Sequence, residues 1–313
     1  MKRREWGAIE QWVANMPLIV GIPKLEALRR RGYRTEMFNA GDTDWDNSTW
    51  WLNRWYDRLW RLPEARQQDR PAFRAAAARI RALGRSGRPF LASVVSVTNH
   101  TPFISREPAF DIAGEATPQA RILNTTRYTD DVLREFVAAL RGEPWFDDTL
   151  LVVVADHGFN LGENRVPAGR ISPYRHALWV PLMILGRHPR LKPGRRGGLA
   201  SLTDLAPTLA DLLGMREPVP WQGHSLVDPP AAGRSFAFGL ESMRVAEDDR
   251  WTAIEIDGDD RPQLFSRSGD WLQRRDFGGA SPVAADLIAR AERQRRLNDY
   301  LLRHDLVWPN PHR

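Results

Sequence analysis

The chain contains no cysteine. This absence excludes disulfide bonds, thiolate metal sites and a cysteine nucleophile, and it leaves the redox compartment undetermined. Lysine is also scarce, because only Lys2, Lys24 and Lys192 among the 45 basic residues are lysines and the others are arginines. These arginines are dispersed among 39 acids. Without runs of like charge or a zinc-finger or RNA-recognition signature, the net charge of +6 does not predict a nucleic-acid partner.

Long hydrophobic runs are missing as well. No apolar stretch approaches the roughly 18 to 20 residues that span a bilayer, and none follows the charged opening Met1-Lys2-Arg3-Arg4. We therefore predict no membrane segment or signal peptide within this chain. Its 313 residues can form one large domain over residues 1–228 and a smaller subdomain over residues 229–313.

Helical and strand patterns alternate along the first two thirds of the chain. The strands are predicted at residues 33–38, 90–98, 150–154 and 178–185, and the helices at 23–31, 70–83, 118–140 and 203–213. This alternation predicts an α/β fold with a mostly parallel central sheet. Between residues 48 and 62, tryptophans at helical spacing predict a further helix that buries an aromatic stripe; they are Trp50, Trp51, Trp55 and Trp60.

The composition changes after the proline-rich stretch at residues 217–230. Short alternating segments between residues 234 and 265 surround the turn Asp257-Gly258-Asp259 and predict antiparallel strands. Residues 284–302 form an amphipathic pattern that predicts a terminal helix.

An acid and an imidazole follow the most apolar strand. The run Leu150–Val154 leads into Ala155, Asp156 and His157, and open α/β sheets place their chemistry beyond the carboxyl ends of such strands. An oxygen and a nitrogen donor suit Mn²⁺, Zn²⁺ or Mg²⁺. In isolation, however, such a pair is more often part of a capped loop. His100 follows the strand at 90–98 in the same way, where a hydrogen-bonded loop histidine is the simpler alternative.

Several short motifs together carry more information than any one of them. In chain order they are Asn99-His100-Thr101-Pro102, Tyr128-Thr129-Asp130, Asp156-His157-Gly158 with Leu161-Gly162-Glu163, Val180-Pro181-Leu182, Asp204-Leu205-Ala206-Pro207-Thr208, Gly223-His224-Ser225-Leu226 and Gln263-Leu264-Phe265. This order resembles the sulfatase branch of the alkaline phosphatase superfamily, over roughly residues 21 to 305. The resemblance implies a three-layer α/β/α sandwich with a mostly parallel sheet, incomplete at its N-terminus, followed by a small antiparallel subdomain and a terminal helix.

Two segments narrow the resemblance. Residues 41–47 and 126–130 are more similar to the lipoteichoic acid synthase group of phosphoglycerol transferases than to aryl sulfatases. That similarity implies a divalent cation held partly by Asp156 and His157, with Mn²⁺ expected first and Mg²⁺, Ca²⁺ or Zn²⁺ as alternatives. It also implies a histidine, His100, that contacts the phosphate or the leaving oxygen. A glycerol phosphate pocket would be lined by Asp42, Trp45 and Asn47.

Two further side chains are candidates for the site. His176 lies where hydrolytic sulfatases often carry acids, which makes it a candidate catalytic residue. Arg127 is a candidate phosphate contact because a guanidinium fork matches phosphate oxygens. Most arginines in a chain so rich in them are nevertheless solvated.

The resemblance places a threonine, serine or formylglycine nucleophile upstream of the helix at 23–31. Residues 1–21 contain no threonine, serine or cysteine, and their only acids are Glu5 and Glu10. We therefore expect the chain to be the carboxyl-terminal portion of a sulfatase-like enzyme, inactive without upstream residues that an in-frame extension would encode. The alternatives are an arylsulfatase-type sulfuric ester hydrolase fragment and a non-catalytic binding module.

The expected substrate is a phosphate or sulfate ester, with lipid-linked glycerol phosphate as the first candidate. The resemblance implies a periplasmic or cell-envelope location and a membrane anchor in a longer parent protein. The interpretation depends on one geometric condition, that Asp156, His157 and His100 face a common cavity.

Overall fold

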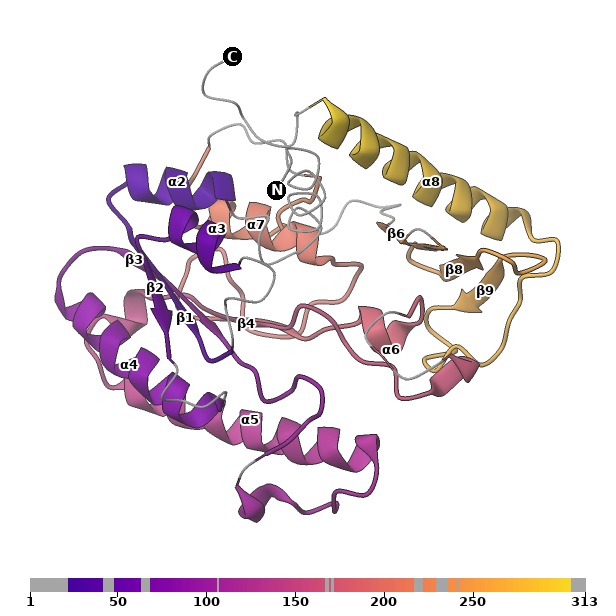
Figure 1. Ribbon diagram of the computed structural model, residues 1–313. Helices are drawn as coiled ribbons and strands as arrows, with labels where there is room; N and C mark the ends of the chain where they lie inside the picture. The colour runs from indigo at the N-terminus through magenta and orange to yellow at the C-terminus, as the bar shows by residue number, and fades with distance from the viewer. Residues whose placement is uncertain are drawn as a thin grey trace. The chain divides into compact units, whose positions relative to one another are not determined.

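The computed structural model describes residues 22–41, 48–62, 68–105, 107–166, 169, 172–216, 222–228, 236–240 and 242–304 (Figure 1). The chain divides into two compact units. One comprises Lys24–Leu151, and the other comprises Val152–Arg313 together with Met1–Pro23. The predicted domain boundary at residue 228 remains a prediction.

The first unit is built around a parallel sheet. Its strands are β1 (Arg34–Asn39), β2 (Arg58–Arg61) and β3 (Phe90–Val95), paired in the order β2-β1-β3. Its helices are α2 (Ile22–Arg30), α3 (Ser48–Trp55), α4 (Asp69–Arg85) and α5 (Pro118–Arg141), with short 3₁₀ turns at Pro108–Phe110 and Phe146–Asp148. The predicted alternation of helices and parallel strands is confirmed here to within a few residues at most ends.

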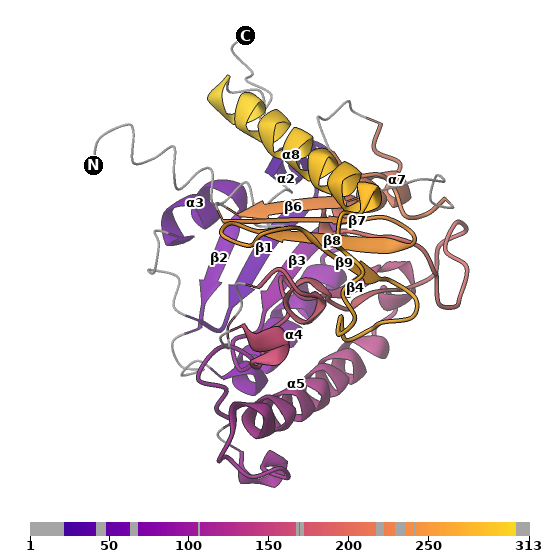
Figure 2. The same cartoon turned by 90° about the vertical axis from the view of Figure 1, so that its right-hand side faces the viewer.

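Helices α4 and α5 cover one face of this sheet (Figures 1 and 2). The apolar stripe of α4 includes Phe73 and Ile80, that of α5 includes Tyr128 and Phe136, and both pack with Phe38 of β1. The rings of Phe73 and Phe136 meet edge to face at 5.4 Å. The helical period of these apolar residues therefore decides which side of each helix turns inward.

Glu36 of β1 is a buried charge on this face of the sheet, with no exposed side-chain surface. Arg79 of α4 donates two hydrogen bonds to it, at 2.9 and 2.6 Å, and the indole nitrogen of Trp60 donates a third at 2.6 Å. Burial raises the pKa of Glu36, but hydrogen bonds from Arg79, Trp60 and Arg34 outweigh it and lower the pKa to about 2. The carboxylate thus stays ionised and ties β1 to α4 and β2.

The predicted tryptophan helix was wrong in its second half. Helix α3 ends at Trp55, and Trp60 lies on β2, where its ring stacks on Phe38 at 5.8 Å. Trp50 keeps 56% of its surface exposed, so α3 does not bury a complete aromatic stripe. After α3 the chain extends and pairs in parallel with β1, and the Asp57 carboxylate just before β2 accepts a hydrogen bond from the backbone N–H of Thr35.

The second unit begins with two short strands, β4 (Leu151–Val154) and β5 (Leu182–Leu185), which pair in a two-stranded sheet. The apolar run of β4 is typical of a strand buried on both faces of a sheet, but all four of its residues are partly exposed, so that expectation is wrong. The strand predicted at 178–185 is shorter than expected, because its first residue closes helix α6 (Arg175–Leu178). Helix α7 (Leu205–Leu212) follows a 3₁₀ turn at Leu202–Asp204.

The C-terminal part of this unit is a four-stranded antiparallel sheet with one long helix, as the sequence predicts (Figure 2). The elements are β6 (Phe236–Leu240), β7 (Met243–Glu247), β8 (Trp251–Ile256), β9 (Gln263–Ser266) and α8 (Pro282–Arg303). Adjacent residues face opposite sides. Ala253 and Leu264 contact α8, whereas Ile254 and Phe265 pack against Tyr174 in the segment that leads into α6.

No helix within the described ranges combines the length and the apolar character needed to cross a membrane.

The depressed pKa of Glu36 predicts an acid-sensitive contribution to stability. Since the folded pKa of about 2 lies below the ordinary 4.5, the contribution is complete above pH 4.5 and is lost as the pH falls through about 2. Its size is about 3 kcal/mol. Urea denaturation at pH 5.5 and 2.5 measures this contribution. Between these pH values, Glu36→Gln should lose less unfolding free energy than wild type does. Glu26→Gln, a change of an exposed acid on α2, should lose as much as wild type. Equal pH slopes for wild type and Glu36→Gln would contradict this account.

Candidate functional site

Asp156 and His157 lie at the carboxyl end of β4, as predicted, and both side chains are accessible, at 52% and 38%. The His157 Nε2 atom is 3.6 Å from the Asp156 Oδ2 atom. On the other side of the imidazole, Nδ1 lies 2.7 Å from the carbonyl oxygen of Gly158. A carbonyl can only accept, so Nδ1 carries the proton in the neutral ring and Nε2 presents a lone pair next to the carboxylate.

This geometry fits two ligands of one cation. Two donor atoms on a tetrahedral ion at about 2.1 Å stand roughly 3.4 Å apart, close to the 3.6 Å between the Asp156 and His157 atoms. A backbone carbonyl on the second ring nitrogen is the usual way in which proteins orient a ligating histidine. Among the described residues, however, no group of three or more acid and histidine side chains is positioned to hold a metal ion. The pair therefore supplies two donors of a site that needs at least one more.

Gly158 fixes the pair to helix α6. Its N–H donates to the carbonyl oxygen of Ala177 at 2.8 Å. A Cβ atom at Gly158 would lie 2.0 Å from the carbonyl oxygen of His176, so only glycine permits this approach. The structure thus brings three predicted residues, Asp156, His157 and His176, into one region. The His176 Nδ1 atom is buried and has no hydrogen-bond partner.

The antiparallel sheet in turn holds α6 in place. Tyr174, just before α6, donates a hydrogen bond from its hydroxyl to the Gln263 side chain on β9 at 2.8 Å, and its ring contacts Phe265 edge to face at 6.1 Å. The motif Gln263-Leu264-Phe265 therefore has a structural role. It anchors the segment against which Gly158 packs.

The motifs around Asp204 and Gly223 contact each other. The buried Asp204 carboxylate accepts from the backbone N–H of His224 at 2.8 Å, and the Thr208 hydroxyl accepts from that of Leu226 at 2.9 Å. A Cβ atom at Gly223 would meet the Thr203 carbonyl oxygen at 2.1 Å. These contacts dock residues 222–228 onto α7, which explains both motifs without a ligand.

His100 lies in the first unit, in the loop that follows β3. Its Nδ1 atom is 2.8 Å from the carbonyl oxygen of Thr101, so this exposed imidazole also presents Nε2 outward. The start of the loop is held by Asp69 at the beginning of α4, whose carboxylate accepts from the N–H groups of Val97 and Thr98. Burial raises the pKa of Asp69, and these hydrogen bonds oppose that rise.

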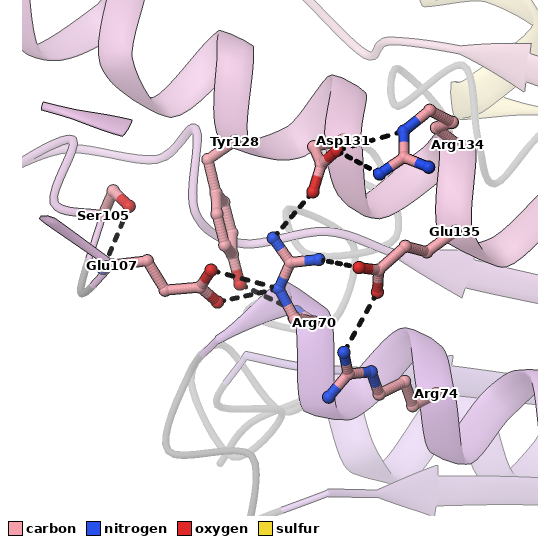
Figure 3. Close-up of polar contacts among 8 residues, drawn as sticks. All are labelled: Arg70, Arg74, Ser105, Glu107, Tyr128, Asp131, Arg134 and Glu135. Carbon is pink, nitrogen blue, oxygen red and sulfur yellow. Dashed lines mark hydrogen bonds and ion pairs between the residues drawn. The ribbon is translucent and has the colours of Figure 1, made fainter. Parts of the chain in front are cut away.

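The far end of the same loop is held by a buried arginine (Figure 3). Arg70 forms ion pairs with three carboxylates, with Glu107 at 2.8 Å, Asp131 at 3.0 Å and Glu135 at 2.5 Å. Its backbone N–H donates to the Tyr128 hydroxyl at 2.9 Å. Burial raises the pKa of Tyr128 to about 12, and Arg70 contributes to the lowered pKa of both acids on α5. Sequence patterns missed this cluster because its members are separated by tens of residues.

The other predicted residues lie apart from these contacts. Arg127 is exposed on α5, next to the buried Tyr128, and its role at a phosphate remains a prediction. Asp42, Trp45 and Asn47 lie outside the described residues. His100 and Arg127 belong to one unit and Asp156, His157 and His176 to the other, so their convergence on a common cavity also remains a prediction.

Comparison with solved structures identifies the fold. A protein of the alkaline phosphatase superfamily from Vibrio parahaemolyticus superposes with a TM-score of 0.71 at 19% identity, over 91% of this chain and 69% of the other. A lipoteichoic acid synthase from Listeria monocytogenes superposes with a TM-score of 0.68 at 15% identity, over 90% and 72%. The predicted alkaline-phosphatase-like α/β fold is therefore confirmed.

Sequence comparison identifies the family. The family model described as Sulfatase matches residues 25–215, so this chain belongs to the sulfatase family. The lipoteichoic acid synthase of Staphylococcus aureus is 27% identical over 145 residues, which cover 41% of this chain. The matched part spans 21% of that synthase's own length.

We predict that Gly158→Ala destabilises the second unit, because the added methyl group must displace the backbone of α6. A loss of about 1–3 kcal/mol in unfolding free energy is expected from overpacking. The matched control is Gly142→Ala, at a position with φ of −81° and open space around a Cβ atom. That change should stay within about 0.5 kcal/mol. Urea denaturation of both variants provides the test, and an unchanged Gly158→Ala protein would contradict the proposed contact.

The Arg70 cluster gives a second prediction. Arg70→Met leaves three carboxylates around an apolar side chain. We expect the unfolding free energy to fall by about 2–4 kcal/mol because these acids are only partly exposed. Arg74→Met removes a guanidinium that is 68% exposed and pairs with one of the same acids, so it should change stability by less than about 1 kcal/mol. Thermal unfolding separates the two cases. Similar losses for both variants would show that burial of Arg70 is not decisive.

Proposed function

We propose that this chain takes part in the metal-assisted transfer or hydrolysis of a phosphate ester, as a protein similar to phosphoglycerol transferases. One observation carries the proposal: the Asp156 carboxylate and the free Nε2 atom of His157 stand 3.6 Å apart at a strand end, on a backbone fixed by Gly158. Membership of the sulfatase family supports ester chemistry in general.

Each predicted residue has a task in this chemistry. Asp156 and His157 would hold the cation, with Mn²⁺ expected first. When bound, such an ion supplies the positive charge that phosphoryl transfer needs at the phosphate oxygens. His100 would donate to the departing oxygen from Nε2 in its doubly protonated form, since its Nδ1–H is committed to the Thr101 carbonyl. Arg127 would bind phosphate oxygens, and His176 would contribute beside the metal pair.

The substrate we propose is glycerol phosphate carried by a lipid, handled in the cell envelope. The likeness to lipoteichoic acid synthases in sequence and in fold supports this choice over a sulfate ester. Residues Asp42, Trp45 and Asn47 would line the glycerol pocket. A sulfuric ester hydrolase is the second candidate, favoured by the family model.

Mn²⁺ binding tests the proposal directly. Calorimetric titration of the chain should show binding that weakens by at least about tenfold in His157→Ala, which removes the nitrogen donor, and in Asp156→Asn, which replaces a charged oxygen donor by a neutral one. The control is His304→Ala, which alters the last described residue of the C-terminal region. It should leave the affinity unchanged. Equal Mn²⁺ binding by wild type and His157→Ala would refute the metal site.

The same titration distinguishes the candidate substrates. With Mn²⁺ present, glycerol phosphate should bind more tightly than glycerol sulfate, and the difference should vanish in His157→Ala. Tighter binding of the sulfate ester would favour the sulfuric ester hydrolase. Binding of glycerol phosphate without any turnover by a protein that carries a complete nucleophile loop would favour a non-catalytic module.

A further inference from the structure

Helix α6 begins with a buried arginine that has no acidic partner. Arg175 is 4% exposed, and no carboxylate in the described part of the chain forms an ion pair with it. Arg70 is buried to a similar degree, but three carboxylates surround it. A buried cation without a counter-ion is costly, so proteins normally pair such a charge or bind a ligand there.

The guanidinium is satisfied on one side only. Its Nη1 atom donates to the carbonyl oxygen of Trp271 at 3.1 Å and lies 3.4 Å from that of Asp270. The Nε and Nη2 atoms are buried and have no hydrogen-bond partner. These two atoms form the edge of a guanidinium that binds carboxylate or phosphate oxygens in a two-point fashion.

A third unused donor belongs to Gln273, which contacts the backbone of Arg175. The Oε1 atom of Gln273 accepts from the backbone N–H of Arg175 at 2.7 Å, while the Nε2 atom of the same amide is buried without a partner. Gln273 itself is 2% exposed. Three N–H-bearing atoms in two contacting residues are therefore withdrawn from water and left unsatisfied, which natural proteins rarely tolerate.

The two acids that act electrostatically on Arg175 already have other partners. Glu247 pairs with Arg267 at 2.6 Å, and the Asp270 carboxylate accepts from the backbone N–H groups of Arg274 and Arg275 at 2.9 and 2.7 Å. Burial lowers the pKa of Arg175, and the coulombic attraction of Glu247 and Asp270 opposes that effect. A bound anion would supply the missing negative charge.

Two indole rings cover the guanidinium. Trp179 and Trp271 meet edge to face at 4.3 Å, and their rings lie 5.5 and 5.2 Å from the guanidinium carbon of Arg175. Both remain open to solvent, with 43% and 55% of their surfaces exposed. Neither ring belongs to the buried core. Exposed indoles also offer an apolar surface for the carbon atoms of a bound polyol.

We propose that Arg175 and Gln273 form an oxyanion site beneath Trp179 and Trp271, which binds the phosphate or sulfate group of a polyol or sugar ester. The inference rests on the proposed function, because it assigns a second anionic group to the substrate of that reaction. Arg175 adjoins His176, whose carbonyl oxygen faces Gly158 beside the metal pair. One ester group would then lie at Asp156 and His157 while another is held at Arg175.

Anion binding in EDTA tests the site separately from the metal pair. Inorganic phosphate and glycerol phosphate are titrated into the whole 313-residue chain by calorimetry, with EDTA removing any cation from Asp156 and His157. Both should bind wild type. Arg175→Met should weaken binding by roughly ten- to hundredfold, in line with the loss of hydrogen bonds to a charged group. The control Arg190→Met removes an arginine that is paired with two acids and should bind within about twofold of wild type.

Two further variants cover other outcomes. Arg175→Lys keeps the charge but not the two-point edge, so it should also bind at least about tenfold more weakly, and it provides the test if Arg175→Met does not fold. Trp271→Ala should weaken the binding of glycerol phosphate more than that of inorganic phosphate. This difference distinguishes an ester from a free ion as the natural ligand. Wild-type affinity in Arg175→Lys, or no phosphate binding by wild type, would overturn the oxyanion site. Either result leaves the Mn²⁺ titration unaffected, so the two proposals fail independently.

Discussion

The contact between Gly158 and helix α6 is the constraint on which the candidate site depends. Because the Gly158 N–H binds the Ala177 carbonyl and its Cα faces the His176 carbonyl, the end of β4 and the start of α6 must keep one spacing. Tyr174 transmits that spacing to β9, and α8 covers the opposite face of the same sheet. Strands that carry no candidate chemistry thus orient the Asp156–His157 pair.

The two histidines predicted to act in different steps are oriented by the same kind of local contact. His157 and His100 each place Nδ1 against the backbone carbonyl of the next residue, at 2.7 and 2.8 Å. A short-range contact of this kind needs no distant partner, and it selects one tautomer with Nε2 available. This tautomer suits a metal ligand at His157, where a carboxylate stands beside Nε2. At His100 it leaves Nε2 able to take up a proton, and donation from Nε2 requires the doubly protonated ring.

The buried charged side chains have two contrasting environments. Glu36 and Arg70 are each surrounded by opposite charges, and each ties several segments of the first unit together. Arg175 has aromatic rings and carbonyl oxygens around it but no acid. The first arrangement is that of structural ion pairs, whereas the second leaves donors ready for a ligand. Composition alone cannot rank these residues, because all three belong to a background of dispersed charges.

The sequence by itself determined the alternation of helices and strands, the parallel sheet, the antiparallel C-terminal part and the placement of Asp156 and His157 after a strand. These features are local or periodic, so neighbouring residues encode them. Only the tertiary structure decided that Trp60 joins a strand, that a side chain at Gly158 would clash with α6 and that Arg70 is paired with acids while Arg175 is not. The physical reason is that each of these depends on groups from separate elements, such as Arg70 and Glu107 at 37 residues' separation, and the spacing of residues along a chain carries no record of which distant groups will meet.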